Sequence, residues 1–121
     1  MKAVFDTNIL IDYLQGDSRA KTEIAKYSNP LISIVTWIEL LVGSRESQED
    51  RKIRQFLQTF TVIGLSKEVA EEAVLLRRSH RIRLPDAIIW ATAKIETCLL
   101  VTRNIKDFPE DDVSIRVPFK I

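Results

Sequence analysis

The stretch KAVFDTNILIDYLQG, residues 2–16, decides the fold class of this chain. Its first part, Lys2–Phe5, is short and apolar in the manner of a strand, and Asn8–Leu14 repeats apolar residues at the spacing of a helix. Gly16 is placed to end that helix. A strand that passes directly into a helix is the first half of a parallel strand–helix–strand unit, and Asp6 stands at the junction.

The rest of the chain repeats this alternation. Strand-like runs are expected at Leu31–Val35, Thr61–Leu65 and Cys98–Val101, and Ile115–Val117 is expected at a sheet edge because Pro118 limits its pairing. Between these runs we expect five helices. Three are expected from the cap Ser18 to Tyr27, from Trp37 to Val42, and from the cap Ser66 through Leu76, and a fourth from Pro85 through Trp90. The fifth contains an apolar stripe that is expected to face the core, formed by Ile53, Phe56, Leu57 and Phe60. Strands that alternate with helices form a mainly parallel sheet, and the right-handed crossovers between them place helices on both faces of the sheet. The sequence therefore predicts an α/β fold, a three-layer α/β/α sandwich with a mainly parallel sheet.

Composition is typical of an ordinary globular protein. The 121 residues, 45% hydrophobic and 29% charged, suit one domain over residues 1–121. The single cysteine, Cys98, permits no disulfide within the chain, and no apolar run resembles a signal peptide or reaches the roughly 18 residues of a membrane span, so we expect a cytoplasmic protein. A formal net charge of +1 neither favours nor excludes a nucleic-acid partner. The single histidine, His80, excludes mechanisms that need several histidines, so any catalysis is expected to use carboxylates.

Acidic and amide side chains follow the predicted strands. Asp6 comes directly after the first strand, Glu39 lies four residues after the second, and Asn104 and Asp107 come just after the fourth. In a parallel sheet the carboxyl ends of the strands meet at one edge, and a loop can bring Asp86 to the same edge. Carboxylates that gather without cations repel one another, and a divalent ion relieves that repulsion. An all-oxygen site suits Mg²⁺ or Mn²⁺ better than Zn²⁺.

Each acidic residue also has a purely structural interpretation. Asp6 can cap the helix that follows it. Thr36 and Glu39 form a capping-box pattern, in which the glutamate reaches back to the backbone amide of the cap. Asp86 lies in a first helical turn, where the helix dipole favours an acid, and Asp107 suits a turn. The residues alone therefore leave both interpretations open.

Four segments, taken in order, resemble the successive motifs of PIN-domain ribonucleases, specifically toxins of the VapC type. Each motif is short, but their order and spacing both match, and they span residues 4–108, almost the whole chain. The segments are VFDTNIL (4–10), IVTWIEL (34–40), LPDA (84–87) and LVTRNIKDF (100–108).

The resemblance implies a Mg²⁺- or Mn²⁺-dependent endoribonuclease that hydrolyses RNA phosphodiester bonds. It also implies a homodimer that a cognate VapB-type antitoxin neutralises. By position, Asp6, Glu39 and Asp86 become the acidic metal ligands and the catalytic residues, while Asn8 and Thr102 support the site through hydrogen bonds.

One position departs from the family's pattern. Many members carry an acid where this chain has Asn104, so Asp107 is a further candidate ligand, directly or through a water. The missing charge leaves open whether a second ion binds tightly without RNA. It is also the motive for one alternative, an inert binding module with the PIN fold. A second alternative keeps the enzyme but assigns it to RNA processing or DNA cleavage without an antitoxin.

A basic run precedes the motif that contains Asp86. Residues 77–83 hold four arginines, of which Arg81 and Arg83 are candidates for holding RNA phosphates beside the metal. A solvated helix end, whose cations complement the helix dipole, accounts for the run equally well.

Overall fold

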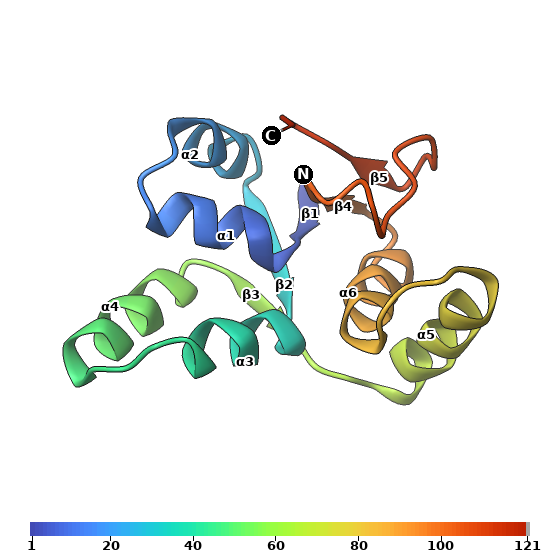
Figure 1. Ribbon diagram of the computed structural model, residues 1–121, viewed down its shortest axis with the longest axis horizontal. Coiled ribbons are helices and arrows are strands. Elements are labelled where there is room, and N and C mark those ends of the chain that lie inside the picture. The colour runs from blue at the N-terminus through green and yellow to red at the C-terminus, as the bar shows by residue number, and fades with distance from the viewer. Residues whose placement is uncertain (121) are drawn as a thin grey trace.

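The computed structural model describes residues 1–120, which form a five-stranded sheet in the order β3-β2-β1-β4-β5 (Figure 1). Every neighbouring pair of strands is parallel, so the predicted sheet is confirmed. The strands are β1 (Lys2–Phe5), β2 (Asn29–Ser33), β3 (Thr61–Ile63), β4 (Leu99–Val101) and β5 (Ile115–Arg116). The helices are α1 (Thr7–Leu14), α2 (Ser18–Ala25), α3 (Ile34–Val42), α4 (Ser47–Leu57), α5 (Lys67–Ser79) and α6 (Leu84–Ile95).

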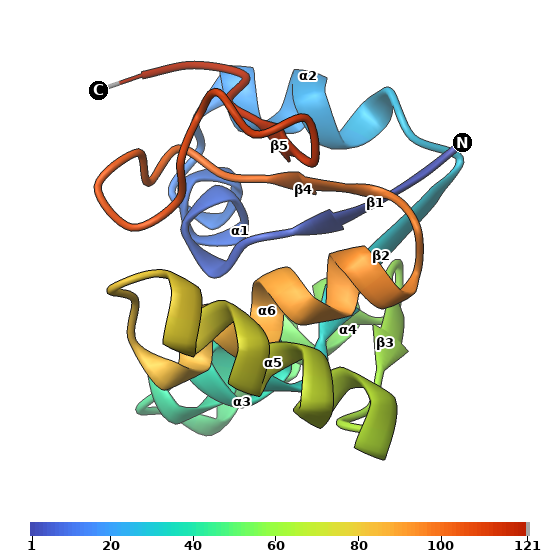
Figure 2. The same cartoon turned by 90° about the vertical axis from the view of Figure 1, so that its right-hand side faces the viewer.

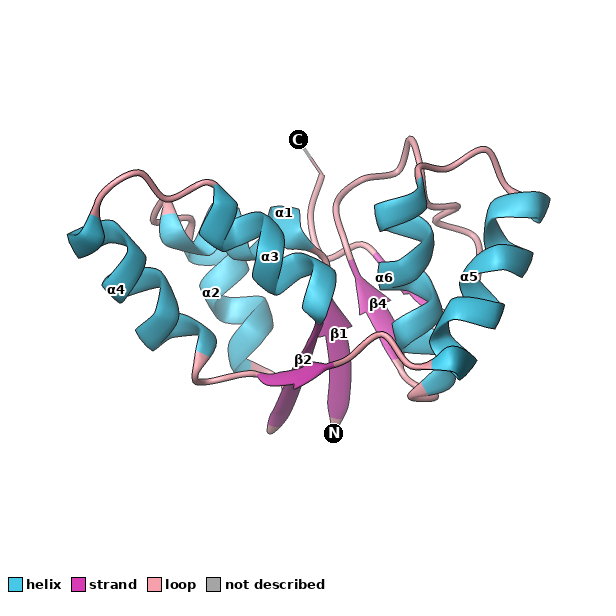
Figure 3. Cartoon of the chain, turned by 90° about the horizontal axis from the view of Figure 1, so that it is seen from below, coloured by secondary structure: helices cyan, strands magenta, loops and turns pink. Residues whose placement is uncertain are grey.

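Helices cover both faces of the sheet, with α1, α2 and α4 on one side and α5 and α6 on the other (Figure 3). The alternation of side chains along β1 explains this arrangement, because successive residues point to opposite faces. Val4 belongs to the apolar cluster beneath α5 and α6, which pack against each other (Figure 2). Ala3 and Phe5 belong to the cluster beneath α1, α2 and α4. The predicted three-layer α/β/α sandwich is therefore correct.

The apolar run at residues 31–35 is divided between two elements, contrary to the prediction of one strand. The strand β2 ends at Ser33, whose hydroxyl accepts a hydrogen bond from the backbone N–H of Val35 at 3.0 Å and so caps α3. The helix begins at Ile34 rather than at Trp37, which puts Thr36 inside it. The capping-box interpretation of Thr36 and Glu39 is therefore wrong, because a serine three residues earlier already supplies the cap.

Smaller differences concern element ends. Asp17, not Ser18, caps α2 by accepting a hydrogen bond from the Arg19 backbone, and α2 ends at Ala25. The helix α4 ends before Phe60, which is nevertheless buried in the core as predicted for its stripe. The predicted cap Ser66 is confirmed, as is the edge position of β5. No helix within residues 1–120 is both long and apolar enough to cross a membrane.

Candidate metal centre

Asp6 lies where β1 ends and is the N-cap of α1. Its backbone N–H donates to the carbonyl of Val101 on β4 at 2.9 Å, which fixes the residue between the two central strands. One carboxylate oxygen accepts from the Thr7 backbone at 2.8 Å, and the other accepts from the Thr102 hydroxyl at 2.7 Å. The residue is buried, with only 4% of its surface exposed to solvent. Asp6 therefore both caps α1 and belongs to the group of acidic residues at this edge of the sheet.

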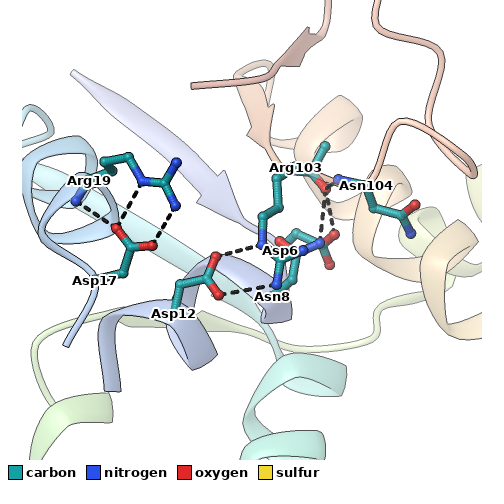
Figure 4. Close-up of polar contacts among 8 residues, drawn as sticks. Asp6, Asn8, Asp12, Asp17, Arg19, Arg103 and Asn104 are labelled. Carbon is teal, nitrogen blue, oxygen red and sulfur yellow. Dashed lines mark hydrogen bonds and ion pairs between the residues drawn. The ribbon is translucent and has the colours of Figure 1, made fainter. Parts of the chain in front are cut away.

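The Thr102 hydroxyl joins three candidate residues, Asp6, Asn8 and Asn104, which lie close together in Figure 4. It donates to Asp6, and it accepts from the backbone N–H of Asn104 at 3.0 Å and from Nδ2 of Asn8 at 3.5 Å. The Asn8 carbonyl oxygen Oδ1 is buried and finds no hydrogen-bond partner within residues 1–120. A buried oxygen without a donor is costly, and a cation or a bound water at this position removes that cost.

Glu39 approaches the same edge from α3. The Thr7 hydroxyl donates to Oε1 of Glu39 at 2.7 Å and lies 3.0 Å from the Thr36 hydroxyl. Glu39 thus contacts the start of α1 instead of its own helix cap. Thr7 and Thr36 are not among the site residues predicted from the sequence, although both lie inside the quoted motifs and Thr36 is fully buried.

Asp86 and Asp107 lie on the β4 side of this edge. Asp86 is buried in the first turn of α6 and pairs with Arg83 at 3.4 Å, although the arginine side chain is 77% exposed. Asp107 accepts from Nδ2 of Asn104 at 2.9 Å, and its backbone N–H donates back to Oδ1 of Asn104 at 3.3 Å. The turn interpretation of Asp107 is thus correct in geometry, and Asn104 is its partner.

The acidic residues act on one another electrostatically. Burial, together with the charges of Asp86 and Glu39, raises the pKa of Asp6 to about 6 against the hydrogen bonds from Thr102 and Thr7. Burial and the charges of Asp107 and Glu39 raise the pKa of Asp86, and the nearby guanidinium of Arg83 opposes that rise. The structure therefore brings the predicted acids to one edge of the sheet, where their charges raise one another's pKa.

The donor set fits a hard divalent cation, because it consists of carboxylate and amide oxygens and includes the orphaned Asn8 oxygen. Within residues 1–120 no three acidic, histidine or cysteine side chains are gathered closely enough to hold an ion jointly. Glu39 is turned to Thr7, and Asp107 is turned to Asn104. Ion binding by these two residues therefore requires their side chains to turn towards Asp6.

The basic run forms an open hollow between the end of α5 and the start of α6. Arg77 donates to the carbonyl of Ile82 and so closes the loop, which is a structural role. The His80 ring packs against Trp90 with 4.8 Å between the ring centroids. Arg81 and Arg83 are exposed, and Arg83 reaches Asp86, so this hollow adjoins the acidic edge.

Comparisons with known proteins agree with this geometry. The PIN domain family model matches residues 3–110. Ribonuclease VapC10 from Mycobacterium tuberculosis is 34% identical over an alignment that covers 96% of this chain and 92% of the relative. A toxin-antitoxin complex from Klebsiella pneumoniae contains a chain with 40% identity and a TM-score of 0.91, with 98% of this chain and 99% of that chain covered. VapBC2 from Rickettsia felis, bound to a DNA fragment from their promoter, gives 26% identity and a TM-score of 0.80, with 96% and 98% covered.

The alignments extend over nearly the full length of each of these relatives, and the acidic edge and the four motifs fall within residues 3–110, which the PIN domain model matches. The chain belongs to the PIN-domain family and, within it, to the VapC ribonucleases.

Proposed function

We propose that this VapC-type protein is the toxin of a VapBC-type pair, a metal-dependent endoribonuclease built as a single PIN domain over residues 1–121 and acting in the cytoplasm. The observation that carries the proposal is the acidic edge of the sheet. There the pKa of Asp6 is raised to about 6 by burial and by the charges of two further acids. Such a cluster is unfavourable without a cation and becomes favourable with one.

Asp6, Glu39 and Asp86 are the proposed catalytic residues and would hold Mg²⁺, for which Mn²⁺ can substitute, with Asn104 and Asp107 as further candidate ligands. When bound, the ion supplies a water of lowered pKa and stabilises charge on the phosphate. The chain's own part is orientation. Thr102 and the Thr7 backbone fix the two oxygens of Asp6, and the Thr7 hydroxyl fixes Glu39. Asn8 supports the site by contacting Thr102.

The RNA backbone would lie along the exposed arginines beside Asp86. Arg81 and Arg83 are exposed at the hollow between α5 and α6, and the contact of Arg83 with Asp86, a proposed ligand, supports this path for the RNA. Phosphate contacts by arginine are strong and independent of sequence, which suits an electrostatic grip on the substrate.

A VapB-type antitoxin is the proposed protein partner, and a homodimer is the proposed assembly of the toxin. The antitoxin proposal is supported by the similarity of this chain to one from a toxin-antitoxin complex of Klebsiella pneumoniae. It is supported also by a groove between α1, α3 and α4, whose lining is partly apolar (Ile11, Leu14, Leu40 and Ile53) and partly polar or charged (Gln15, Glu39, Glu49 and Lys52). A segment that fills this groove reaches a candidate metal ligand, Glu39, which suits an inhibitor.

Metal binding separates this function from that of an inert module. Calorimetric titration of the purified protein with Mn²⁺ is expected to show sub-millimolar binding that Asp6→Asn and Asp86→Asn weaken. Incubation of matched RNA and DNA oligonucleotides with Mg²⁺ or Mn²⁺ is expected to cut the RNA only. Absence of Mn²⁺ binding would favour the inert module, and cleavage of the DNA would favour the alternative nuclease.

A further inference from the structure

A second polar contact, beside the candidate metal centre but outside it, ties the loop after β4 to α1. The Arg103 guanidinium donates two hydrogen bonds to the Asp12 carboxylate, from Nε at 2.6 Å and from Nη2 at 3.1 Å (Figure 4). The two side chains retain 24% and 11% of their exposure, so the pair is largely screened from water. A bidentate arginine–carboxylate pair fixes orientation as well as distance, unlike a loose surface ion pair.

The position of Asp12 relates this pair to the site. Asn8 and Asp12 are four residues apart on α1, so both lie on one face of the helix. Asn8 contacts Thr102, and Asp12 contacts the next residue, Arg103. The loop is therefore attached to one helix face at two successive residues, and its next residue is Asn104.

We propose that Asp12 and Arg103 are positioning residues for the candidate metal centre, which hold the loop of residues 102–107 against α1. This inference rests on the proposed function for its purpose. The contact keeps the Thr102 hydroxyl on Asp6, and it keeps the Asn104–Asp107 pair at the edge where the ion would bind. Without it, only the contacts of Thr102 with Asp6 and Asn8 would join the loop to the start of α1, and the oxygen atoms of the site would lose their fixed spacing.

The chain contains a matched control pair. The Arg116 guanidinium also donates two hydrogen bonds, from Nε and Nη2, to the Glu23 carboxylate, and the pair joins β5 to α2. Glu23 and Arg116 are 93 residues apart in the sequence, and Asp12 and Arg103 are 91 residues apart. Within residues 1–120 the side chains of Glu23 and Arg116 form no hydrogen bond with a candidate site residue. The backbone carbonyl of Arg116 does accept from the Thr102 N–H at 3.0 Å, but Arg116→Gln leaves that backbone bond in place. Loss of the side-chain pair thus reports what a bidentate ion pair contributes outside the contact between the loop and α1.

Hydrogen exchange measured by NMR tests the positioning directly and needs no metal. The backbone N–H of Asn104 is bonded to Thr102, and that of Asp107 is bonded to Asn104, whereas the N–H of Leu100 lies inside the sheet. With Arg103→Gln we expect exchange at Asn104 and Asp107, relative to Leu100, to accelerate about tenfold, the factor for about 1.4 kcal/mol. With Arg116→Gln the ratio should stay at its wild-type value. Arg103→Lys keeps the charge without the fork and should fall between wild type and Arg103→Gln.

The second arm measures metal affinity through the rise in melting temperature that Mn²⁺ causes. The half-saturating Mn²⁺ concentration should increase about tenfold with Arg103→Gln or Asp12→Asn and stay unchanged with Arg116→Gln. An unchanged exchange ratio in Arg103→Gln, or an equal rise in Arg116→Gln, would overturn the positioning role. An unchanged Mn²⁺ requirement in Arg103→Gln would overturn its link to the metal centre. If the wild type shows no response to Mn²⁺, the proposed function fails, and the exchange arm still decides whether the pair positions the loop.

Discussion

Asp6 combines two tasks that usually fall to different residues. As the N-cap of α1 it is stabilising, because one oxygen satisfies a free backbone N–H. As a buried acid near Asp86 and Glu39 it is destabilising when charged. Asparagine caps a helix as well as aspartate does and carries no charge, so Asp6→Asn separates the two tasks.

The pH dependence of stability tests the strain at Asp6. A pKa that rises from 3.8 in the unfolded chain to about 6 in the folded one means that the folded state binds more protons between these values. Metal-free stability therefore falls as pH rises from about 4 to about 6, by an amount on the order of 3 kcal/mol. Urea unfolding in EDTA should show Asp6→Asn equal to wild type at pH 4 and more stable at pH 7.

Asp17 provides a control of opposite sign. It also caps a helix, but its hydrogen bonds from Arg19 lower its pKa to about 2. Its contribution is therefore present above the unfolded pKa of 3.8 and is lost as pH falls towards 2. Asp17→Asn should destabilise the protein at pH 7. If Asp6→Asn were destabilising at pH 7 as well, the strain assigned to Asp6 would be wrong.

Asn104 is the residue at which this chain departs from its family's motif. Its Nδ2 donates to Asp107, so Asn104→Asp replaces a donor with a carboxylate that faces another carboxylate. We expect metal-free stability to fall by about 1–3 kcal/mol and to recover with Mn²⁺, which should bind more tightly. Melting curves and calorimetry with and without Mn²⁺ measure both effects.

The control for Asn104→Asp is the double variant that combines Asn104→Asp with Asp107→Asn. It exchanges the two residues and so restores one amide–carboxylate pair. It should regain the metal-free stability that Asn104→Asp loses. If Asn104→Asp changed neither stability nor affinity, residue 104 would lie outside the metal's reach, and Asp107 would be the better fourth ligand.

At the scale of elements, the turn from α6 into β4 contains a strained residue. Thr97 has a φ of +54°, a left-handed conformation that is unfavourable for a β-branched side chain. Thr97→Gly is expected to stabilise the protein by about 1 kcal/mol, measured by thermal or urea unfolding. Thr97→Ala keeps a Cβ atom and should therefore stabilise the protein much less than Thr97→Gly does. A loss of stability in Thr97→Gly would contradict the strain.

The loop between α5 and α6 contains the arginines that are proposed to contact RNA phosphates. In EDTA, which prevents cleavage, Arg81→Gln should weaken RNA binding and reduce the slope of log affinity against log salt by about 0.7, the value for one contact to a single strand. Arg83→Gln should do the same but also removes the partner of Asp86. Arg51, exposed on α4, is the control, and Arg51→Gln should leave the slope unchanged. An unchanged slope in Arg81→Gln would identify the run as solvated surface only.

At the scale of the whole molecule, the order of strands and helices was predictable because each element has its own local pattern. The boundary inside residues 31–35 was not, since strand and helix there are equally apolar and only the hydroxyl of Ser33 marks the change. That one displaced boundary produced the wrong capping box. The contact between Glu39 and Thr7 joins residues 32 apart, so local rules cannot predict it.

The position of the acidic residues at one edge of the sheet was predictable, but the hydrogen bonds that orient them were not. The ends of parallel strands placed the acids at one edge, and the family motifs chose among them. The Asp12–Arg103 pair was missed, because a contact across 91 residues depends on how the loop packs on α1. A signal for it existed, since Asp12 shares a helix face with Asn8 and Arg103 lies between Thr102 and Asn104.

Digestion of total cellular RNA by the purified protein, with cleavage ends mapped by sequencing, tests the central claim most directly. With Mg²⁺ or Mn²⁺, the wild type and the control Asp17→Asn should produce the same discrete set of ends. Asp6→Asn, Asp86→Asn and wild type in EDTA should produce none, while the melting curves of the variants show that they are folded. Cleavage that persisted in Asp6→Asn or in EDTA, or a wild type that cut no RNA with Mn²⁺, would contradict the account.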